Sequence, residues 1–278
     1  MICDLHLHTT ASDGSVCPSG VIGKASRAGI KFCAITDHDA ISGICEAVSE
    51  GEKLGVEVIR GIELSTYKDG EMHVLGYGMR LDENFLNALK QAKQTRRERN
   101  LEVLQNLKKH GIVIEENELY DGKGEEKGRL HIARLMVAKK HVSCVNEAFD
   151  LWLGVSGKAY AKVKRFTPEE GAEIITRSGG IAVFAHPMNK RLEDGFEDLI
   201  RSMKGAGLKG IEVFYPSHSA QDRMAYIALA KKHNLIMTGG SDYHCDSANV
   251  KVGAGNADLS LDTIELLRNT NTKNGDKK

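Results

Sequence analysis

The chain contains little of what marks a secreted, fibrous or membrane protein. Among its 278 residues are four prolines and one tryptophan, and 38 Lys and Arg balance 38 Asp and Glu. No apolar run is long enough to span a bilayer, and a strand-like segment follows Met1 almost at once, without the basic and apolar regions of a signal peptide. A net charge of zero gives no overall attraction to nucleic acid or membranes. We therefore expect a cytoplasmic protein with no membrane partner.

The six cysteines lack the spacing of a disulfide framework or of a CxxC pair. Cys3 and Cys33 lie in apolar segments, where cysteine behaves as a small hydrophobic residue. Cys245 follows a histidine, and a nearby metal can lower the pKa of its thiol, but the neighbouring residues already supply suitable ligands. Reduced thiols agree with a cytoplasmic location.

What the sequence does contain is three short groups of metal-ligand residues, each placed just after an apolar run. The groups are His6-Leu7-His8, Thr36-Asp37-His38-Asp39 and Ser241-Asp242-Tyr243-His244. Side chains alternate along a strand, so two ligands spaced as His-x-His or Asp-x-His share a face. Asp13 follows in a turn from which it can return to the same centre. The pattern predicts one metal centre at one end of a barrel or sheet.

Each candidate also has an ordinary interpretation. A single histidine is more often a surface or core residue than a ligand, and Asp37 can cap the helix that follows it. His38 nevertheless closes the strand-like segment Phe32-Cys33-Ala34-Ile35. Because the other groups share this setting, the joint pattern favours the metal centre.

Strand and helix patterns alternate at both ends of the chain. We expect strands at 2–6, 32–36, 57–64, 181–185, 210–214 and 235–238, and helices at 18–28, 41–54, 168–178, 196–206, 221–233 and 260–269. Alternation of this kind predicts a parallel sheet, and the number of units favours closure into a barrel. The segment 71–77, which contains His73, is expected to be an extra strand that returns beside Glu63.

Functional residues of such barrels lie at the carboxyl ends of the strands. Six candidates fall there: Asp37, His38, Glu63, His186, Asp242 and His244. Their agreement in position supports the predicted centre independently of the motifs.

The alternation stops between residues 82 and 165. This segment reads as a long, charge-rich helix at 84–110 and further helices at 130–141 and 145–153, and it carries 17 Lys and Arg against 12 Asp and Glu. We therefore expect a barrel domain formed by residues 1–81 and 166–278, interrupted by an inserted, basic helical cap domain at 82–165.

These motifs resemble those of the PHP (polymerase and histidinol phosphatase) family. The resemblance rests on His6-x-His8, Asp13, the run 35–39, Glu63, His73, Ala185-His186-Pro187 and Ser241-Asp242-x-His244. It implies an α/β fold, a distorted (β/α)7 TIM-like barrel that holds three divalent metals. The inserted helical segment and the run from Arg129 to Arg134 are similar to PHP phosphoesterases that act on nucleotides and short RNA.

The resemblance also implies a ligand set. His6, His8, Glu63 and Asp242 would hold the first metal, Glu63, His73 and His186 the second with Glu63 bridging, and Asp13, His38 and His244 the third. Mixed imidazole and carboxylate ligands suit Mn or Fe first and Zn next. Asp37 and Asp39 are expected behind the ligands, where a carboxylate can orient a ligating histidine.

Such a site predicts a metal-dependent phosphoesterase. A hydroxide that bridges two metals can act as the nucleophile near neutral pH, and no serine or phosphate-loop motif offers another. We assign catalytic roles to Asp242, His244 and Arg134: either of the first two, or a metal-bound water, can protonate the leaving oxygen. The expected substrates are nucleotide monoesters such as AMP, 3',5'-bisphosphonucleotides or the 5' end of short RNA.

The candidate substrate contacts are Arg129, His131, Arg134 and His218. On a helix His131 and Arg134 share a face, and an arginine fork matches a phosphate; the alternative is a solvated basic surface. Three other functions stay open: histidinol-phosphate or another small-molecule phosphatase, a noncatalytic metal-binding PHP module, and an amidohydrolase-like C–N hydrolase. The filled ligand set disfavours the second, and three metals disfavour the third. No obligate protein partner is evident.

Overall fold

The computed structural model describes the chain apart from residues 1, 121–125, 188–194, 247–249, 255–256 and 275–278. Its strands form one sheet in the order β7-β6-β5-β4-β3-β2-β1-β8. The strands are β1 (Ile2–Leu7), β2 (Phe32–Ile35), β3 (Glu57–Tyr67), β4 (Glu71–Tyr77), β5 (Ile181–Phe184), β6 (Leu208–Phe214), β7 (Ile236–Gly239) and β8 (Ala257–Asp258). The expected strands are therefore present, and β8 is an addition.

The strand β4 makes the sheet mixed rather than purely parallel. It is antiparallel to both β3 and β5, while the pairs β1–β2, β2–β3, β5–β6 and β6–β7 are parallel. Only three residues, 68–70, connect β3 to β4, and a parallel pair needs a crossover of a dozen residues or more. The pairing of Ser65 with His73 confirms the extra strand beside Glu63.

The sheet curls into a distorted barrel because β1 meets the segment after β7. Leu7 forms a parallel bridge with Tyr243, and the amide of His8 donates to the Tyr243 carbonyl at 3.0 Å. At Gly240 an added Cβ would stand 2.3 Å from the Cβ of His6, so glycine is required for this approach. The fold is thus the TIM-like barrel that the resemblance implies, with β8 paired antiparallel to the start of β1.

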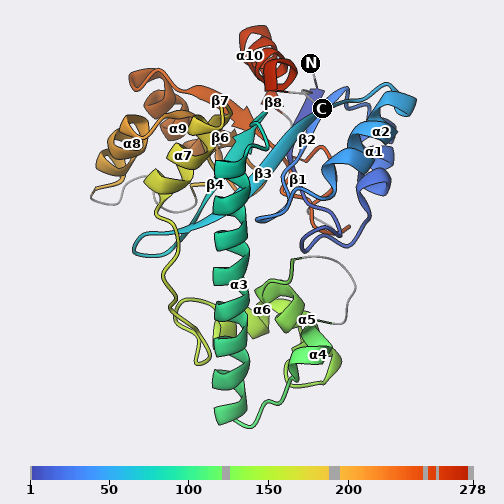
Figure 1. Cartoon of the computed structure of the whole chain (residues 1–278), viewed down its shortest axis with the longest axis vertical. Helices are drawn as coiled ribbons and strands as arrows, with labels where there is room; N and C mark the ends of the chain where they lie inside the picture. The colour runs from blue at the N-terminus through green and yellow to red at the C-terminus, as the bar shows by residue number, and fades with distance from the viewer. Residues whose placement is uncertain (1, 121–125, 188–194, 247–249, 255–256, 275–278) are drawn as a thin grey trace.

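Helices flank the curled sheet at the left and the right of Figure 1. They are α1 (Pro18–Arg27), α2 (Ile44–Leu54), α7 (Pro168–Arg177), α8 (Phe196–Gly205), α9 (Ala220–Lys232) and α10 (Leu261–Asn274). The last of these closes one end of the barrel, where Ile264 and Leu267 pack with Cys3 and Leu5 in one apolar cluster. The opposite, open end lies at the carboxyl ends of the parallel strands.

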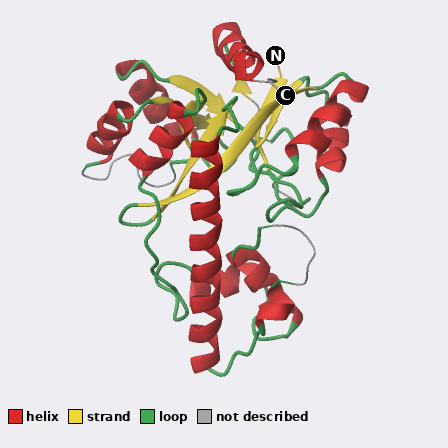
Figure 2. Cartoon of the chain, in the orientation of Figure 1, coloured by secondary structure: helices red, strands yellow, loops and turns green. Residues whose placement is uncertain are grey.

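A second body of helices lies beyond that open end (Figure 2). It contains α3 (Glu83–Lys109), α4 (Glu116–Leu119), α5 (Arg129–Ala138), α6 (Val145–Ala148) and a π-helical turn, η1 (Phe149–Leu153). These helices share an apolar cluster that includes Leu107, Ile132 and Met136 and is separate from the barrel clusters. The helix expected at 145–153 is thus α6 plus a π turn, α4 was not expected, and the cap boundaries at 82 and 165 stay a prediction.

In the part of the chain that the structure describes, no helix has the length and apolar character needed to cross a bilayer.

Candidate metal centre

The nine predicted ligands meet at the open end of the barrel. They come from six barrel strands or the segments just after them: His6, His8 and Asp13 from β1 and its loop, His38 after β2, Glu63 on β3, His73 on β4, His186 after β5, and Asp242 and His244 after β7. Within the described residues, all of them except His186 form adjoining groups in which one atom of each member lies within 4.8 Å of the others. His186 joins them through Glu63, at 3.0 Å.

The first group surrounds a point between β1, β3 and the end of β7. His6 Nε2 lies 3.3 Å from both Glu63 Oε2 and Asp242 Oδ1, and His8 Nε2 lies 3.1 Å from the same two oxygens. These four buried atoms have no hydrogen-bond partner among the described residues. Ligand atoms about 2.1 Å from one ion, at mutual angles of about 90–110°, are about 3.0–3.4 Å apart. The group therefore fits a divalent metal.

Glu63 also faces a second group with its other oxygen. Its Oε1 lies 2.8 Å from His73 Nδ1 and 3.0 Å from His186 Nε2, while its Oε2, turned to the first group, lies 3.1 Å from His38 Nδ1. The two oxygens of one carboxylate thus point at two sets of imidazoles. This geometry is the one that the predicted bridging role of Glu63 requires.

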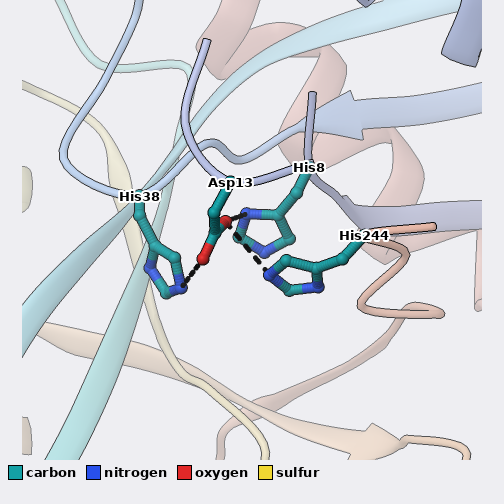
Figure 3. A group of neighbouring side chains, drawn as sticks. All are labelled: His8, Asp13, His38 and His244. Atoms are coloured by element: carbon teal, nitrogen blue, oxygen red, sulfur yellow. Dashed lines mark ion pairs between the residues drawn. The ribbon is translucent and has the colours of Figure 1, made fainter. Parts of the chain in front are cut away.

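The third group gathers around Asp13 (Figure 3). Asp13 Oδ1 lies 3.2 Å from His244 Nε2 and 3.8 Å from His8 Nδ1, and Asp13 Oδ2 lies 3.9 Å from His38 Nε2. The rings of His8 and His244 stack at 4.0 Å. His8 was expected only in the first group, but its two nitrogens face the first and third groups.

The charges of this cluster suit metal ligands. Burial alone raises the pKa of Glu63, but His38, His73 and His6 outweigh burial and hold that pKa well below its usual range. Burial likewise raises the pKa of Asp13, but His244 and His38 outweigh burial and lower that pKa well below its usual range. Burial lowers the pKa values of His38 and His73. At the other four ligand histidines burial acts in the same direction, but the nearby carboxylates outweigh it and raise the pKa. A bound cation would displace those protons, because metal binds ionised carboxylates and neutral imidazoles.

Two further buried carboxylates hold the ligand loops in place. Asp37 accepts hydrogen bonds from Thr9 N and Thr9 Oγ1, both at 2.7 Å, and from Ser12 Oγ at 2.6 Å, which positions the turn that carries Asp13. Asp4 accepts from Ser241 N at 2.9 Å and so anchors the segment of Asp242 and His244. Each of these carboxylates thus ties a ligand-bearing loop to a neighbouring part of the barrel.

The expected role of Asp37 and Asp39 differs from the one observed. Among the described residues, neither carboxylate forms a hydrogen bond with a histidine ring. Asp37 instead holds a loop. Asp39 accepts hydrogen bonds from Arg96 at 2.6 and 2.9 Å and from Ser65 N at 2.9 Å. The reason is that both nitrogens of the neighbouring His38 face other carboxylates, those of Glu63 and Asp13.

The four predicted substrate contacts lie in different surroundings. Arg134 Nη1 donates to the Asp13 carbonyl at 3.2 Å, and His131, whose pKa burial lowers to about 4, accepts from the Gly128 amide. Arg129 instead pairs with Glu71 and donates to the Leu153 carbonyl. His218 is buried and donates from Nδ1 to the Val213 carbonyl at 2.8 Å. Of the four, Arg134 is the one with a described hydrogen bond to the loop of a candidate ligand.

Sequence reasoning missed two residues that contact the centre. Glu212 lies against His6 and His186, and the Tyr215 hydroxyl donates to Asp242 Oδ2 at 3.0 Å. The available signal was an acidic residue inside the otherwise apolar run Ile211-Glu212-Val213-Phe214, because carboxylates are seldom buried without a specific partner.

A curled α/β barrel with adjoining groups of histidines and carboxylates at the carboxyl ends of its strands defines a metal-dependent barrel hydrolase. The chain belongs to the PHP domain family, whose pattern matches residues 4–264.

Relatives match over nearly their whole length. A 5'-3' exoribonuclease of Haemophilus influenzae is 33% identical over 92% of this chain and 94% of its own. A phosphoribosyl 1,2-cyclic phosphate 1,2-diphosphodiesterase of Eggerthella lenta is 32% identical over 88% and 94%. A 3',5'-nucleoside bisphosphate phosphatase of Chromobacterium violaceum is 32% identical over 87% and 86%. A Bifidobacterium adolescentis crystal structure described as a metal-dependent phosphoesterase superposes with a TM-score of 0.86, 26% identity and 96% of each chain covered.

Proposed function

We propose that this protein is a metal-dependent phosphoesterase that removes phosphate from nucleotides carrying a second phosphate or from the 5' end of short RNA. It would use three divalent ions, Mn or Fe first and Zn next. The activities named for its full-length relatives support this reading. We place the enzyme in the cytoplasm, because its six cysteines, all within the described residues, form no disulfide.

The observation that carries the proposal is the set of unpartnered, buried ligand atoms shared around Glu63. Bound divalent ions would activate a water and neutralise phosphate oxygens. The chain itself supplies the means to hold and orient the substrate. Arg134, anchored on the Asp13 carbonyl at 3.2 Å, is placed to bind a phosphate oxygen beside the third group.

A basic cavity next to the centre supports a second phosphate. It has a volume of about 170 Å³ and is lined by Asp39, Ser65, Arg96, Arg99, Lys164 and Arg165, among others. The side chains of Arg96, Arg99 and Arg165 are only 8%, 3% and 4% exposed. Ser65 lies two residues after Glu63 on β3, so the two side chains share a face. The cavity therefore adjoins the centre.

This cavity has more buried positive than negative charge. Arg96 pairs with Asp39, whereas Arg99, Arg129 and Arg165 all pair with the one carboxylate of Glu71. Burial, together with the nearby Arg96 and Arg165, lowers the pKa of Arg99 well below its usual range. A bound anion would supply the negative charge that this cavity lacks, and guanidinium groups bind phosphate well.

A second cavity beside the centre offers space for the nucleoside. It has a volume of about 280 Å³, lies beside His73 and His186, and is also lined by Met72, Phe184 and Tyr215. Aromatic and apolar side chains suit the flat face of a base. Histidinol phosphate carries a single phosphate and would leave the arginine cavity unused.

The first test is phosphate release from a panel of esters by the Mn-loaded protein. We expect release from a 3',5'-bisphosphonucleotide and from a 5'-phosphorylated RNA trimer, slower release from AMP, and none from histidinol phosphate. Release from histidinol phosphate alone would make the protein a small-molecule phosphatase. Failure on all four esters by a metal-loaded protein would favour the noncatalytic module.

Arg165→Gln tests the second-phosphate cavity. We expect the KM for a 3',5'-bisphosphonucleotide to rise about tenfold to a hundredfold, because a hydrogen bond to a charged group contributes about 1.5–3 kcal/mol. The KM for AMP should stay within about twofold, since AMP has no second phosphate for the cavity. Arg201→Gln, on the exposed surface of α8, is the matched control. Equal increases of KM for both substrates would place the second phosphate elsewhere.

A further inference from the structure

Glu212 is a fully buried carboxylate at the centre of β6, a strand that supplies none of the nine candidate ligands. Burying a carboxylate is costly unless hydrogen bonds or charges satisfy it. Its oxygens lie 3.1 and 3.2 Å from His6 Nδ1, and Oε2 accepts from the His186 amide at 2.8 Å. Glu212 thus contacts one member of the first ligand group and one member of the second.

The contact with His6 determines which ring nitrogen carries the proton. A carboxylate accepts but does not donate, so Nδ1 must carry a hydrogen to bond with Glu212. In a neutral imidazole Nε2 then keeps its lone pair. His6 Nε2 has no hydrogen-bond partner and lies 3.3 Å from Glu63 Oε2 and from Asp242 Oδ1. The lone pair is therefore directed at the point where the first metal would bind.

The contact with His186 positions a ligand of the second group. His186 follows β5, which pairs with β6 in parallel, so the carboxylate on β6 can reach its amide. The His186 ring then lies with Nε2 3.0 Å from Glu63 Oε1 and stacks on the His6 ring at 5.5 Å. One side chain thereby fixes the distance between two ligands that face opposite oxygens of Glu63.

We propose that Glu212 is a positioning residue. It holds His6 in the tautomer whose Nε2 can bind metal, and it holds the His186 ring in place beside Glu63 Oε1. In this way it sets the metal affinity of two adjoining groups. The inference rests on the proposed function for its metals, but not on the identity of the substrate. It predicts that loss of the Glu212 charge weakens metal binding without changing the recognition of phosphate esters.

Glu212→Gln tests this role, because glutamine keeps the shape but offers one accepting oxygen and no charge. Removal of such a supporting group typically lowers metal affinity about 10- to 100-fold. We expect calorimetric titration of the metal-stripped variant with Mn to show a loss of that size. At limiting Mn kcat should fall, excess Mn should restore it, and KM at saturating Mn should match the wild type. Glu173→Gln, on the exposed face of α7, is the control.

Two outcomes would overturn the proposal: unchanged Mn affinity in Glu212→Gln, or a kcat that excess Mn does not restore. If the variant does not fold, ¹⁵N histidine spectra of the Zn-loaded wild type decide the matter, since they must show His6 protonated at Nδ1, and a proton on Nε2 would refute the role. A wild type that binds Mn but cleaves no nucleotide would contradict the proposed function and leave this inference standing.

Discussion

Glu63→Gln should reduce phosphate release by at least about a thousandfold, since losing about 4 kcal/mol of metal-supplied charge stabilisation has that effect on rate. The two oxygens of Glu63 face different groups, with Oε1 at 2.8 Å from His73 and Oε2 at 3.1 Å from His8. Glutamine presents a neutral oxygen to one group and an NH2 to the other. We therefore expect both adjoining metals to bind poorly.

Glu57→Gln is the control for this experiment, because Glu57 begins the same strand and pairs with Arg268 at the surface. That variant should keep wild-type activity and metal content. The readouts are phosphate release from a bisphosphonucleotide, bound metal by elemental analysis, and circular dichroism to establish folding. A folded Glu63→Gln protein with more than a tenth of wild-type kcat would refute the shared role of Glu63.

Removal of metal should abolish activity and lower the melting temperature. Buried ligand atoms of His6, His8, His38, Glu63 and Asp242 have no hydrogen-bond partner among the described residues, so a metal that binds only the folded chain stabilises it. Metal at one hundred times its Kd contributes about 2.7 kcal/mol per site. For a chain of this size that corresponds to a gain of about 5–10 °C.

The measurement is a thermal melt of the chelator-stripped protein with increasing Mn, followed by phosphate release from the same samples. Asp13→Asn provides the comparison, because it removes the carboxylate at the centre of the third group and should show a smaller gain on saturation with Mn. A stripped protein with the melting temperature and activity of the loaded one would show that the cluster is not a metal centre.

The sequence alone predicted much of this arrangement because the relevant signals are local. Two imidazoles spaced as His6-x-His8 share a face of a strand by period alone, and ligands that follow apolar strands meet wherever parallel strands end together. The extra strand beside Glu63 was predicted as well. Its pairing with β5 on its other edge was not, because strand order depends on which edges remain free once the barrel curls.

Local sequence signals did not predict which carboxylates hold the ligand histidines in place. Asp37 was expected to orient a histidine, but Thr9 and Ser12 take up its oxygens. The carboxylate that does contact a candidate ligand ring from behind is Glu212, 206 positions from His6. No periodicity links residues so far apart, and only the closure of the barrel through β7 and the segment after it brings the Glu212 side chain beside His6.

The sequence by itself determined the type of centre. The chemistry of the ligands and the face that they share are properties of short segments, and they do not depend on how the strands pair with one another. The tertiary structure decided how the ligands are shared and supported: the two directions of the Glu63 carboxylate, the tautomer of His6, and the gathering of Arg96, Arg99 and Arg165 around two carboxylates. These features depend on distances between strands and helices that are far apart in the chain, and such distances exist only after the chain has packed.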